Sequence, residues 1–524
     1  MTTASVNDIV AAGAAANDAG DGVAQGRIGR NLCWMGAAVF LGSALQYALY
    51  FWIARYLGPA EYGLFSTVLT IAILTGPLVD LGMGVTLVWV AAKDPAQLAQ
   101  TIGSSIVWRA VLTAPMAIVA AIVVVAQNGS GALALFVPLY LATHLDGLGT
   151  MCSTAFQARE RMDLAASTML TRNLLRAASF GIALFAGAGV VEIAWWVFAG
   201  SVLGVCWSWR RLRRTMPVSF ARPFRWDVVR GALPFGLGII ASMAHQQIDV
   251  VLLGALAPRE EVGIYHAGVR FYILAQLVAQ TVAVVVQPLS YRHGLKGTAE
   301  SVAILRLKTA GLAALGTLGA LVFALCADDL VGVVLGGGYA ASVPIVLATA
   351  PLVFLKFVSS PLADTITCLG RRTWLTVGLW LSLAVNVGAN LVLIPRHGAL
   401  GAVIACVISE CVLAVWLFGS VALAGVEVGW HTLISECVLA VWLFGSVALA
   451  GVEVGWHTLL RNALALSAVG ASLWWAMRGM AVPVRGEWVA GACVVTALLL
   501  AALRPTTEES VLKGVLRGRR AAGV

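Results

Sequence analysis

The segment Leu57–Phe65, LGPAEYGLF, separates two long apolar stretches, and a similar segment, LAPREEVGIY, occupies Leu256–Tyr265. The prolines of the two segments are 199 positions apart, and Gly63 and Gly263 are 200 positions apart. Six apolar stretches lie between corresponding positions, so both turns fall on the same side of a membrane. This spacing predicts two halves of parallel topology, related by an axis along the membrane normal, as in some secondary transporters.

Apolar stretches of similar length fill most of the remaining chain. A transmembrane helix needs about 20 mainly apolar residues. On that rule the sequence predicts spans near residues 32–54, 64–90, 103–126, 132–154, 168–188, 190–209, 231–254, 264–288, 309–327, 341–362, 373–394, 400–424, 462–477 and 488–503. We therefore predict an all-α polytopic membrane protein with two pseudo-symmetric six-helix lobes, two C-terminal helices and about 14 spans in total.

Composition supports a membrane protein. Hydrophobic residues make up 60% of the chain and charged residues 11%, and the mean hydropathy is +0.90. A soluble domain carries roughly 25% charged residues, so this chain lacks the charge to cover a water-facing surface. The net charge of +9 comes from residues in short connectors rather than from a dense basic stripe, so we expect no nucleic-acid partner.

The connectors also predict the orientation. With the N-terminus placed in the cytoplasm, 23 Lys and Arg residues fall in inner segments and five in outer ones. The positive-inside rule then puts both termini on the cytoplasmic side of the bacterial inner membrane. The predicted organisation is a disordered tail (1–30), an N-lobe (31–215), a C-lobe (216–433), a duplicated segment (434–459), two C-terminal helices (460–504) and a basic tail (505–524).

The duplicated segment is an identical tandem copy, since Ile408–Leu433 recurs as Ile434–Leu459. A full span in the second copy would move the basic tail to the outer side. Its uninterrupted apolar stretch, Cys437–Val452, has 16 residues, short of the ~20 that a span needs. We predict that the second copy adds no ordinary span to the bundle.

Several short motifs, in this order and spacing, resemble one known family. They cover roughly residues 30–430 and comprise ARYLGP (54–59) with EYG (61–63), FQA (156–158) before Glu160-Arg161, LPF (233–235), QID (247–249) with Leu253-Gly254, GYA (338–340), Asn386 and Asn390, and IPRHG (394–398) with Gly401-Ala402. The chain is similar to the polysaccharide-biosynthesis flippases of the Wzx type. Their superfamily also contains multidrug/cation exporters and peptidoglycan lipid-precursor flippases.

The resemblance implies translocation of an undecaprenyl-pyrophosphate-linked oligosaccharide across the cytoplasmic membrane, for export of exopolysaccharide, O-antigen or a similar glycan. The implied partners are this lipid-linked substrate, membrane lipids, a glycan polymerase and export machinery. A multidrug/cation antiporter of the same fold is the alternative, and a membrane-embedded polymerase or ligase is a third reading. We expect no enzyme activity, cofactor or metal, because the sequence has no phosphate-binding loop and no nucleophile elbow.

Basic residues inside the predicted spans are the candidate substrate-binding groups. A Lys or Arg at mid-membrane costs roughly 2.5–3.5 kcal/mol on insertion scales, so it should face a cavity or a partner. A guanidinium binds phosphate oxygens in bidentate fashion, which suits a pyrophosphate. The candidates, led by Arg270 in span eight, are Arg270, Arg109, Lys356, Arg172 and Arg176. For each, snorkelling to a headgroup or anchoring at the inner surface is the competing interpretation.

Two acidic residues, Asp249 in span seven and Asp80 in span two, are the candidate ion-coupling groups. A buried carboxylate either pairs with an Arg or takes up a proton or Na⁺ that couples transport to a gradient. Both interpretations are compatible with the sequence.

Overall fold

The computed structural model describes residues 6–220, 226–293 and 299–424. Within these residues the secondary structure is helical and contains no strand. The first six α-helices are α1 (Val6–Asp80), α2 (Met83–Lys93), α3 (Leu98–Asn128), α4 (Leu133–Ala158), α5 (Met162–Phe185) and α6 (Val190–Thr215). The next five are α7 (Trp226–Leu256), α8 (Arg259–His293), α9 (Ala299–Val334), α10 (Val343–Cys368) and α11 (Arg372–Leu423). The predicted all-α class is confirmed for this part of the chain.

Short 3₁₀ turns connect some of these helices, at η1 (Pro95–Gln97), η2 (Ser130–Ala132) and η3 (Gly337–Ser342). Nine helical segments of the described residues are long and apolar enough to cross a membrane. Their outward side chains are apolar: on α3, Val111, Ile118 and Ile122 are each more than 60% exposed. A helix whose exposed surface is apolar along its length is suited to lipid rather than water.

Two of the long helices bend at a glycine. Gly58 in α1 has φ 74° and ψ 170°, and Gly398 in α11 has φ 55° and ψ −134°. Side chains other than hydrogen rarely fit these conformations. Each glycine therefore joins two helical segments without an intervening loop, at the positions where the sequence predicts a turn between consecutive spans.

The predicted second span, 64–90, is interrupted. α1 ends at Asp80 and α2 begins at Met83, because Leu81 and Gly82 both have positive φ, 44° and 82°. A Cβ on Gly82 would lie 2.7 Å from the carbonyl oxygen of Ala232 in α7. The break thus lets α1 and α2 approach α7 closely, which hydropathy alone does not predict.

The first helix begins close to the N-terminus. α1 begins at Val6, within the stretch 1–30 that the sequence predicts to be a tail. The sequence AAGAAANDAG (11–20) is rich in alanine, the residue with the highest helix propensity. That propensity favours a helical backbone in this stretch.

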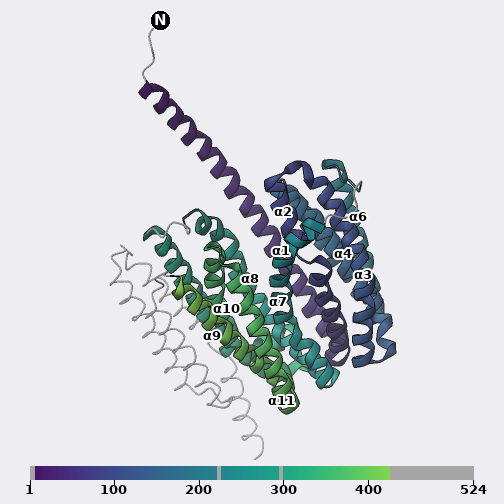
Figure 1. Ribbon diagram of the computed structural model, residues 1–524. Helices are drawn as coiled ribbons and strands as arrows, with labels where there is room; N and C mark the ends of the chain where they lie inside the picture. The colour runs from purple at the N-terminus through teal and green to yellow at the C-terminus, as the bar shows by residue number, and fades with distance from the viewer. Residues whose placement is uncertain (1–5, 221–225, 294–298, 425–524) are drawn as a thin grey trace, which may run out of the picture. The chain divides into compact units, whose positions relative to one another are not determined.

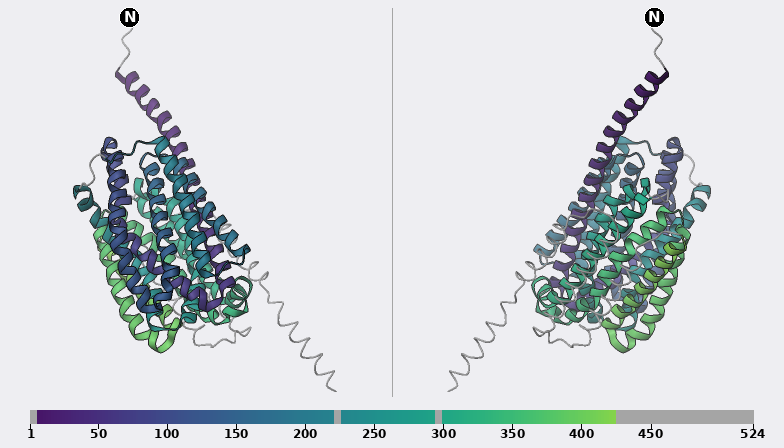
Figure 2. Two further views of the ribbon diagram at one scale, coloured as in Figure 1. Left: turned by 90° about the vertical axis from the view of Figure 1, so that its right-hand side faces the viewer. Right: turned by 90° about the vertical axis from the view of Figure 1, so that its left-hand side faces the viewer.

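We call α1–α6 the N-terminal half and α7–α11 the C-terminal half. Figure 1 shows α2, α3, α4 and α6 on one side of α1 and α7, and α8–α11 on the other. The most extensive contact between two described helices joins α1 to α8, and α1 also packs against α7. The side views in Figure 2 show the helices of both halves running side by side. α1 is therefore the main element of the boundary between the halves.

The chain divides into two compact units, Met1–Val428 and Gly429–Val524. Both halves belong to the first unit. The duplicated segment 434–459, the predicted helices 460–504 and the basic tail 505–524 lie outside the described residues.

Candidate functional site

Arg270 is buried at the boundary between the halves. It belongs to α8 and is 8% exposed. Its guanidinium carbon lies 3.9 Å from the ring centroid of Tyr50 and 5.8 Å from that of Tyr47, both on α1. A guanidinium over an aromatic face gains about 0.5–2 kcal/mol, more as the pair is desolvated. Residues of one half thus enclose the cation of the other.

The remaining neighbours of Arg270 are also uncharged or aromatic. Its Nη2 lies 3.3 Å from Nε2 of His266, one turn earlier on α8, and the His266 ring is 5.8 Å from that of Tyr62. No acidic side chain in the described ranges forms an ion pair with Arg270, and its buried Nε has no hydrogen-bond partner there. A buried cation without a counter-ion is costly, so an anionic ligand would bind here favourably.

Contacts between the halves also occur at the turns that the sequence predicts to lie on the outer side. The Tyr339 hydroxyl donates a hydrogen bond to the Ala54 carbonyl at 2.7 Å. Arg259 donates to the carbonyl of Asn128 at 2.7 Å, and Arg55 donates to that of Val333 at 3.2 Å. These side chain-to-backbone bonds join the two halves on this side.

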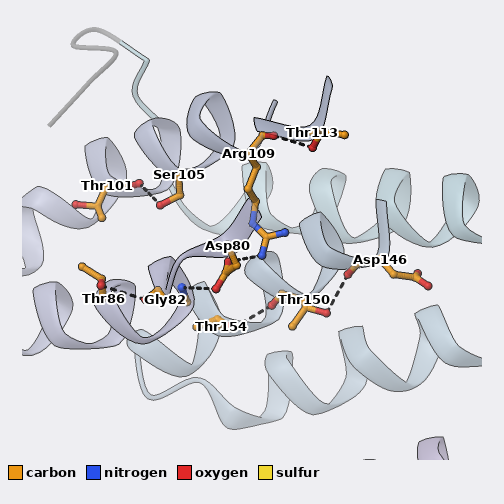
Figure 3. A network of polar contacts seen from close by, with 11 residues as sticks. Asp80, Gly82, Thr86, Thr101, Ser105, Arg109, Thr113, Asp146, Thr150 and Thr154 are labelled. Atoms are coloured by element: carbon orange, nitrogen blue, oxygen red, sulfur yellow. Dashed lines mark hydrogen bonds and ion pairs between the residues drawn. The ribbon is translucent and has the colours of Figure 1, made fainter. Parts of the chain in front are cut away.

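In the N-terminal half, the predicted arginines are paired. Arg109 on α3 forms an ion pair with Asp80 at the end of α1, and Figure 3 shows the two side chains pointing toward each other. A Cβ on Gly147 of α4 would lie 2.5 Å from Arg109 Nη1, so this glycine makes room for the guanidinium. The pair therefore holds α1, α3 and α4 together.

Arg172 and Arg176 lie one turn apart on α5. Arg176 forms an ion pair with Asp146 of α4. Arg172 is 7% exposed and donates a hydrogen bond to the Thr150 hydroxyl at 3.1 Å. Both side chains thus point into the helix bundle, toward the polar face of α4.

The C-terminal half contains a separate buried polar network around Asp249 of α7. Asn390 Nδ2 donates to Asp249 Oδ1 at 2.6 Å, and the Cys406 thiol donates to Oδ2 at 2.9 Å. Lys356 of α10 forms an ion pair with Glu410 at 2.7 Å. These contacts join α7, α10 and both segments of α11 in the interior of the half.

The sequence analysis did not single out Glu410. In the structure this residue is 1% exposed and forms an ion pair with Lys356. The available signal was a single carboxylate within the apolar stretch 400–424. An isolated charge in a span requires a partner, and that argument could have found Glu410 as it found Asp249.

The predicted site residues therefore fall into three groups rather than one. Arg270 lies with tyrosines at the boundary, Arg109, Asp80, Arg172 and Arg176 lie in the N-terminal half, and Lys356 and Asp249 lie in the C-terminal half. The described residues contain no group of three or more His, Cys, Asp or Glu side chains arranged to hold a metal ion.

Comparison with known proteins identifies the family and the fold. The family model described as "Polysaccharide biosynthesis protein" matches residues 28–292, which is half of the chain. No curated protein sequence matches significantly. Among solved structures, "Lipid II flippase MurJ, inward closed conformation" aligns with a TM-score of 0.65 at 12% identity, covering 83% of this chain and 96% of that one.

Two multidrug transporter structures have a similar fold. An outward-facing MATE family transporter of the MOP superfamily aligns with a TM-score of 0.54 at 13% identity, covering 80% of this chain and 96% of that one. An inward-facing MATE family transporter of the same superfamily aligns with a TM-score of 0.58 at 14% identity, covering 78% and 96%. At these identities the likeness concerns the fold. This chain is a multi-pass membrane protein that belongs to the polysaccharide biosynthesis protein family and has the fold of the MOP superfamily.

Proposed function

We propose that this protein is a flippase that moves an undecaprenyl-pyrophosphate-linked oligosaccharide across the bacterial inner membrane by alternating access, for export of exopolysaccharide or an O-antigen-type glycan. The observation that carries the proposal is Arg270, a buried cation without an acidic partner among the described residues, at the boundary between the two halves. Family membership supports a role in making polysaccharide.

The pyrophosphate is the part of the cargo that Arg270 would bind. Among the described residues, the Nε of Arg270 has no hydrogen-bond partner, and the guanidinium is contacted by tyrosines of α1 and by His266. A pyrophosphate would accept charge-assisted hydrogen bonds from it, which are about twice as strong as neutral ones. Arg109, Arg172, Arg176 and Lys356 would add positive potential, although three of these four are ion-paired in this conformation.

Coupling to an ion gradient is assigned in this proposal to Asp249 and Asp80. Asp249 accepts hydrogen bonds from an amide and a thiol, and Asp80 is paired with Arg109. Uptake of a cation by either carboxylate would weaken these contacts, which join different helices. Such a change can alter the packing of one half as the protein alternates between states.

Both termini would lie in the cytoplasm, and the chain would cross the membrane 14 times. α1 and α11 would each contribute to two spans, which are joined at the bends at Gly58 and Gly398. The protein would act as a secondary transporter without a cofactor and without enzymatic chemistry. A glycan polymerase and export machinery would take up the flipped product.

A multidrug/cation antiporter is the second candidate, and the fold likeness to MATE transporters favours it. A cationic drug calls for an unpaired acid in the cavity. Among the described residues at the boundary, however, the buried charge without an ion pair is the cation Arg270. The buried acids lie inside the C-terminal half, where Glu410 is paired with Lys356 and Asp249 accepts hydrogen bonds from Asn390 and Cys406. The charges therefore favour an anionic cargo.

The test is deletion of the gene in its native host, with measurement of lipid-linked oligosaccharide and surface glycan. Completed repeat units should accumulate on undecaprenyl pyrophosphate while surface glycan is lost. Wild type should restore export, Arg270→Ala should not, and the exposed Arg161→Ala should serve as the matched control. Unchanged glycan with raised drug sensitivity would replace the flippase proposal with the exporter.

A further inference from the structure

We infer that a cavity inside the N-terminal half is the binding subsite for the sugar residue attached directly to the pyrophosphate. The inference rests on the proposed function and assigns it a second contact, separate from Arg270. The cavity has a volume of about 190 Å³ and lies among α1, α4, α5 and α6.

The cavity wall carries polar groups from three helices. α1 contributes Gln46 and Tyr50, α4 contributes Thr143 and Asp146, and α5 contributes Asn173 and Arg176. Asp146 and Arg176 form an ion pair, yet Asp146 Oδ1 is buried without a hydrogen-bond partner among the described residues. The Asp146 carboxylate is therefore an unsatisfied acceptor beside the cavity, and a ligand hydroxyl can satisfy it once the side chains that enclose Oδ1 move aside.

The rest of the cavity wall is apolar and includes the rings of Phe65 and Phe180. A sugar ring presents hydroxyls at its edge and C–H groups on its faces, so it needs amides, carboxylates and guanidinium groups together with apolar walls. An amide such as Asn173 can both donate and accept, which suits a hydroxyl. The mixture on this wall matches that chemistry better than it matches a lipid tail or a bare ion.

The volume limits the ligand to one residue. It is smaller than the roughly 300 Å³ at which pockets for drug-sized ligands begin. A single sugar ring fits this space, whereas a whole oligosaccharide repeat does not.

Tyr50 connects this cavity to Arg270 and so identifies which sugar would occupy it. Its ring lines the cavity and also lies 3.9 Å from the Arg270 guanidinium carbon. Its hydroxyl accepts a hydrogen bond from Gln46 Nε2 at 3.2 Å. A pyrophosphate on Arg270 would therefore have its first sugar beside Tyr50, with the later sugars extending away from the cavity.

The experiment measures binding to the full-length purified protein in nanodiscs. The probes are undecaprenyl pyrophosphate alone, the same lipid with one hexose, and the same lipid with one N-acetylhexosamine. We expect wild type to bind one of the sugar-bearing probes about tenfold more tightly than the bare lipid, because the sugar adds hydrogen bonds inside a buried site. Arg270→Ala should weaken all three probes.

Two variants test the cavity in different ways. Asn173→Leu removes the amide, and Ala142→Leu fills space at the wall. Both should abolish the tenfold preference and leave the affinity for undecaprenyl pyrophosphate unchanged. Ala178→Leu, on the exposed side of α5, is the matched control and should keep the preference.

Each result is decisive for one proposal. Equal wild-type affinity for all three probes, or an equal loss for bare and sugar-bearing lipid in both cavity variants, would overturn the sugar subsite and leave the flippase proposal intact. If undecaprenyl pyrophosphate does not bind, or if its affinity is the same in wild type and Arg270→Ala, the proposed pyrophosphate site is wrong. The sugar subsite, which depends on that site, is then wrong as well.

Discussion

Gly63 of α1 and Gly263 of α8 pack reciprocally. A Cβ on Gly63 would overlap the carbonyl oxygen of Arg259 and lie 3.0 Å from the Gly263 nitrogen. A Cβ on Gly263 would overlap the carbonyl oxygen of Pro59 and lie 3.1 Å from the Gly63 nitrogen. The two turn segments that resemble each other in sequence therefore contact each other directly, and only glycine permits this approach of the backbones.

Alanine at either glycine should weaken this contact. We expect Gly63→Ala and Gly263→Ala each to destabilise the protein by about 1–3 kcal/mol, because the added methyl meets backbone atoms that cannot move aside. Thermal unfolding in detergent measures the loss, and hydrogen exchange should rise in both turn segments. Gly388→Ala has no atom within 4 Å of its new methyl and is the control. Melting temperatures equal to that of the control would contradict the prediction.

Lys356 and Glu410 should be strongly coupled. Lys356→Met or Glu410→Gln alone leaves one buried charge unpaired, for which we expect a cost of about 3–5 kcal/mol. The double variant should recover most of the stability, since neither charge remains. A double-mutant cycle of thermal unfolding gives the coupling. Removal of the exposed pair Arg161–Asp163 should leave the melting temperature unchanged, and additive effects for Lys356 and Glu410 would count against the buried pair.

The two glycine bends should differ in sensitivity. Gly58→Ala meets only backbone strain, since no atom lies within 4 Å, and a residue forced into such a conformation costs about 1–3 kcal/mol. Gly398→Ala would in addition collide with the Glu261 carboxylate, which accepts a hydrogen bond from the Ala399 N–H at 3.1 Å. We expect the larger fall in melting temperature for Gly398→Ala. The reverse order would show that the Glu261 contact is unimportant.

Asp249→Asn tests the proposed ion coupling. The substitution keeps the size of the side chain but removes its charge, so transport should lose its dependence on the ion gradient while substrate binding is retained. Counterflow in proteoliposomes with and without a gradient measures the first quantity, and affinity for undecaprenyl pyrophosphate measures the second. Asp163→Asn, at an exposed position, is the control. Wild-type gradient dependence in Asp249→Asn would exclude this carboxylate from coupling.

The duplicated segment makes a prediction about topology. We expect the C-terminus to lie in the cytoplasm both in the full chain and after deletion of residues 434–459. The reason is that the apolar stretch of the second copy is too short to form an ordinary span. A reporter fused after Val524 that is active on only one side of the membrane gives the answer for both chains. A change of side on deletion would mean that the second copy does cross.

The amino-acid sequence alone was sufficient to predict the membrane character, the helical class, the family and the two turns at which α1 and α11 bend. Uninterrupted apolar stretches specify helices that cross lipid, and the glycines at positions 58 and 398 allow conformations that other residues resist. It also singled out Arg270 and Asp249, since a charge inside a span is unusual wherever it points.

The partners of the charged residues became known from the packing of the helices. Helical periodicity tells which face a residue occupies but not which helix covers that face, so the pairs Arg109–Asp80, Lys356–Glu410 and Arg270–Tyr50 could not be assigned from spacing. The members of the last pair are 220 positions apart in the chain. Their contact depends on how α1 packs against α8, and that packing is set by close backbone approaches, such as the one between Gly63 and Gly263, that no local pattern encodes.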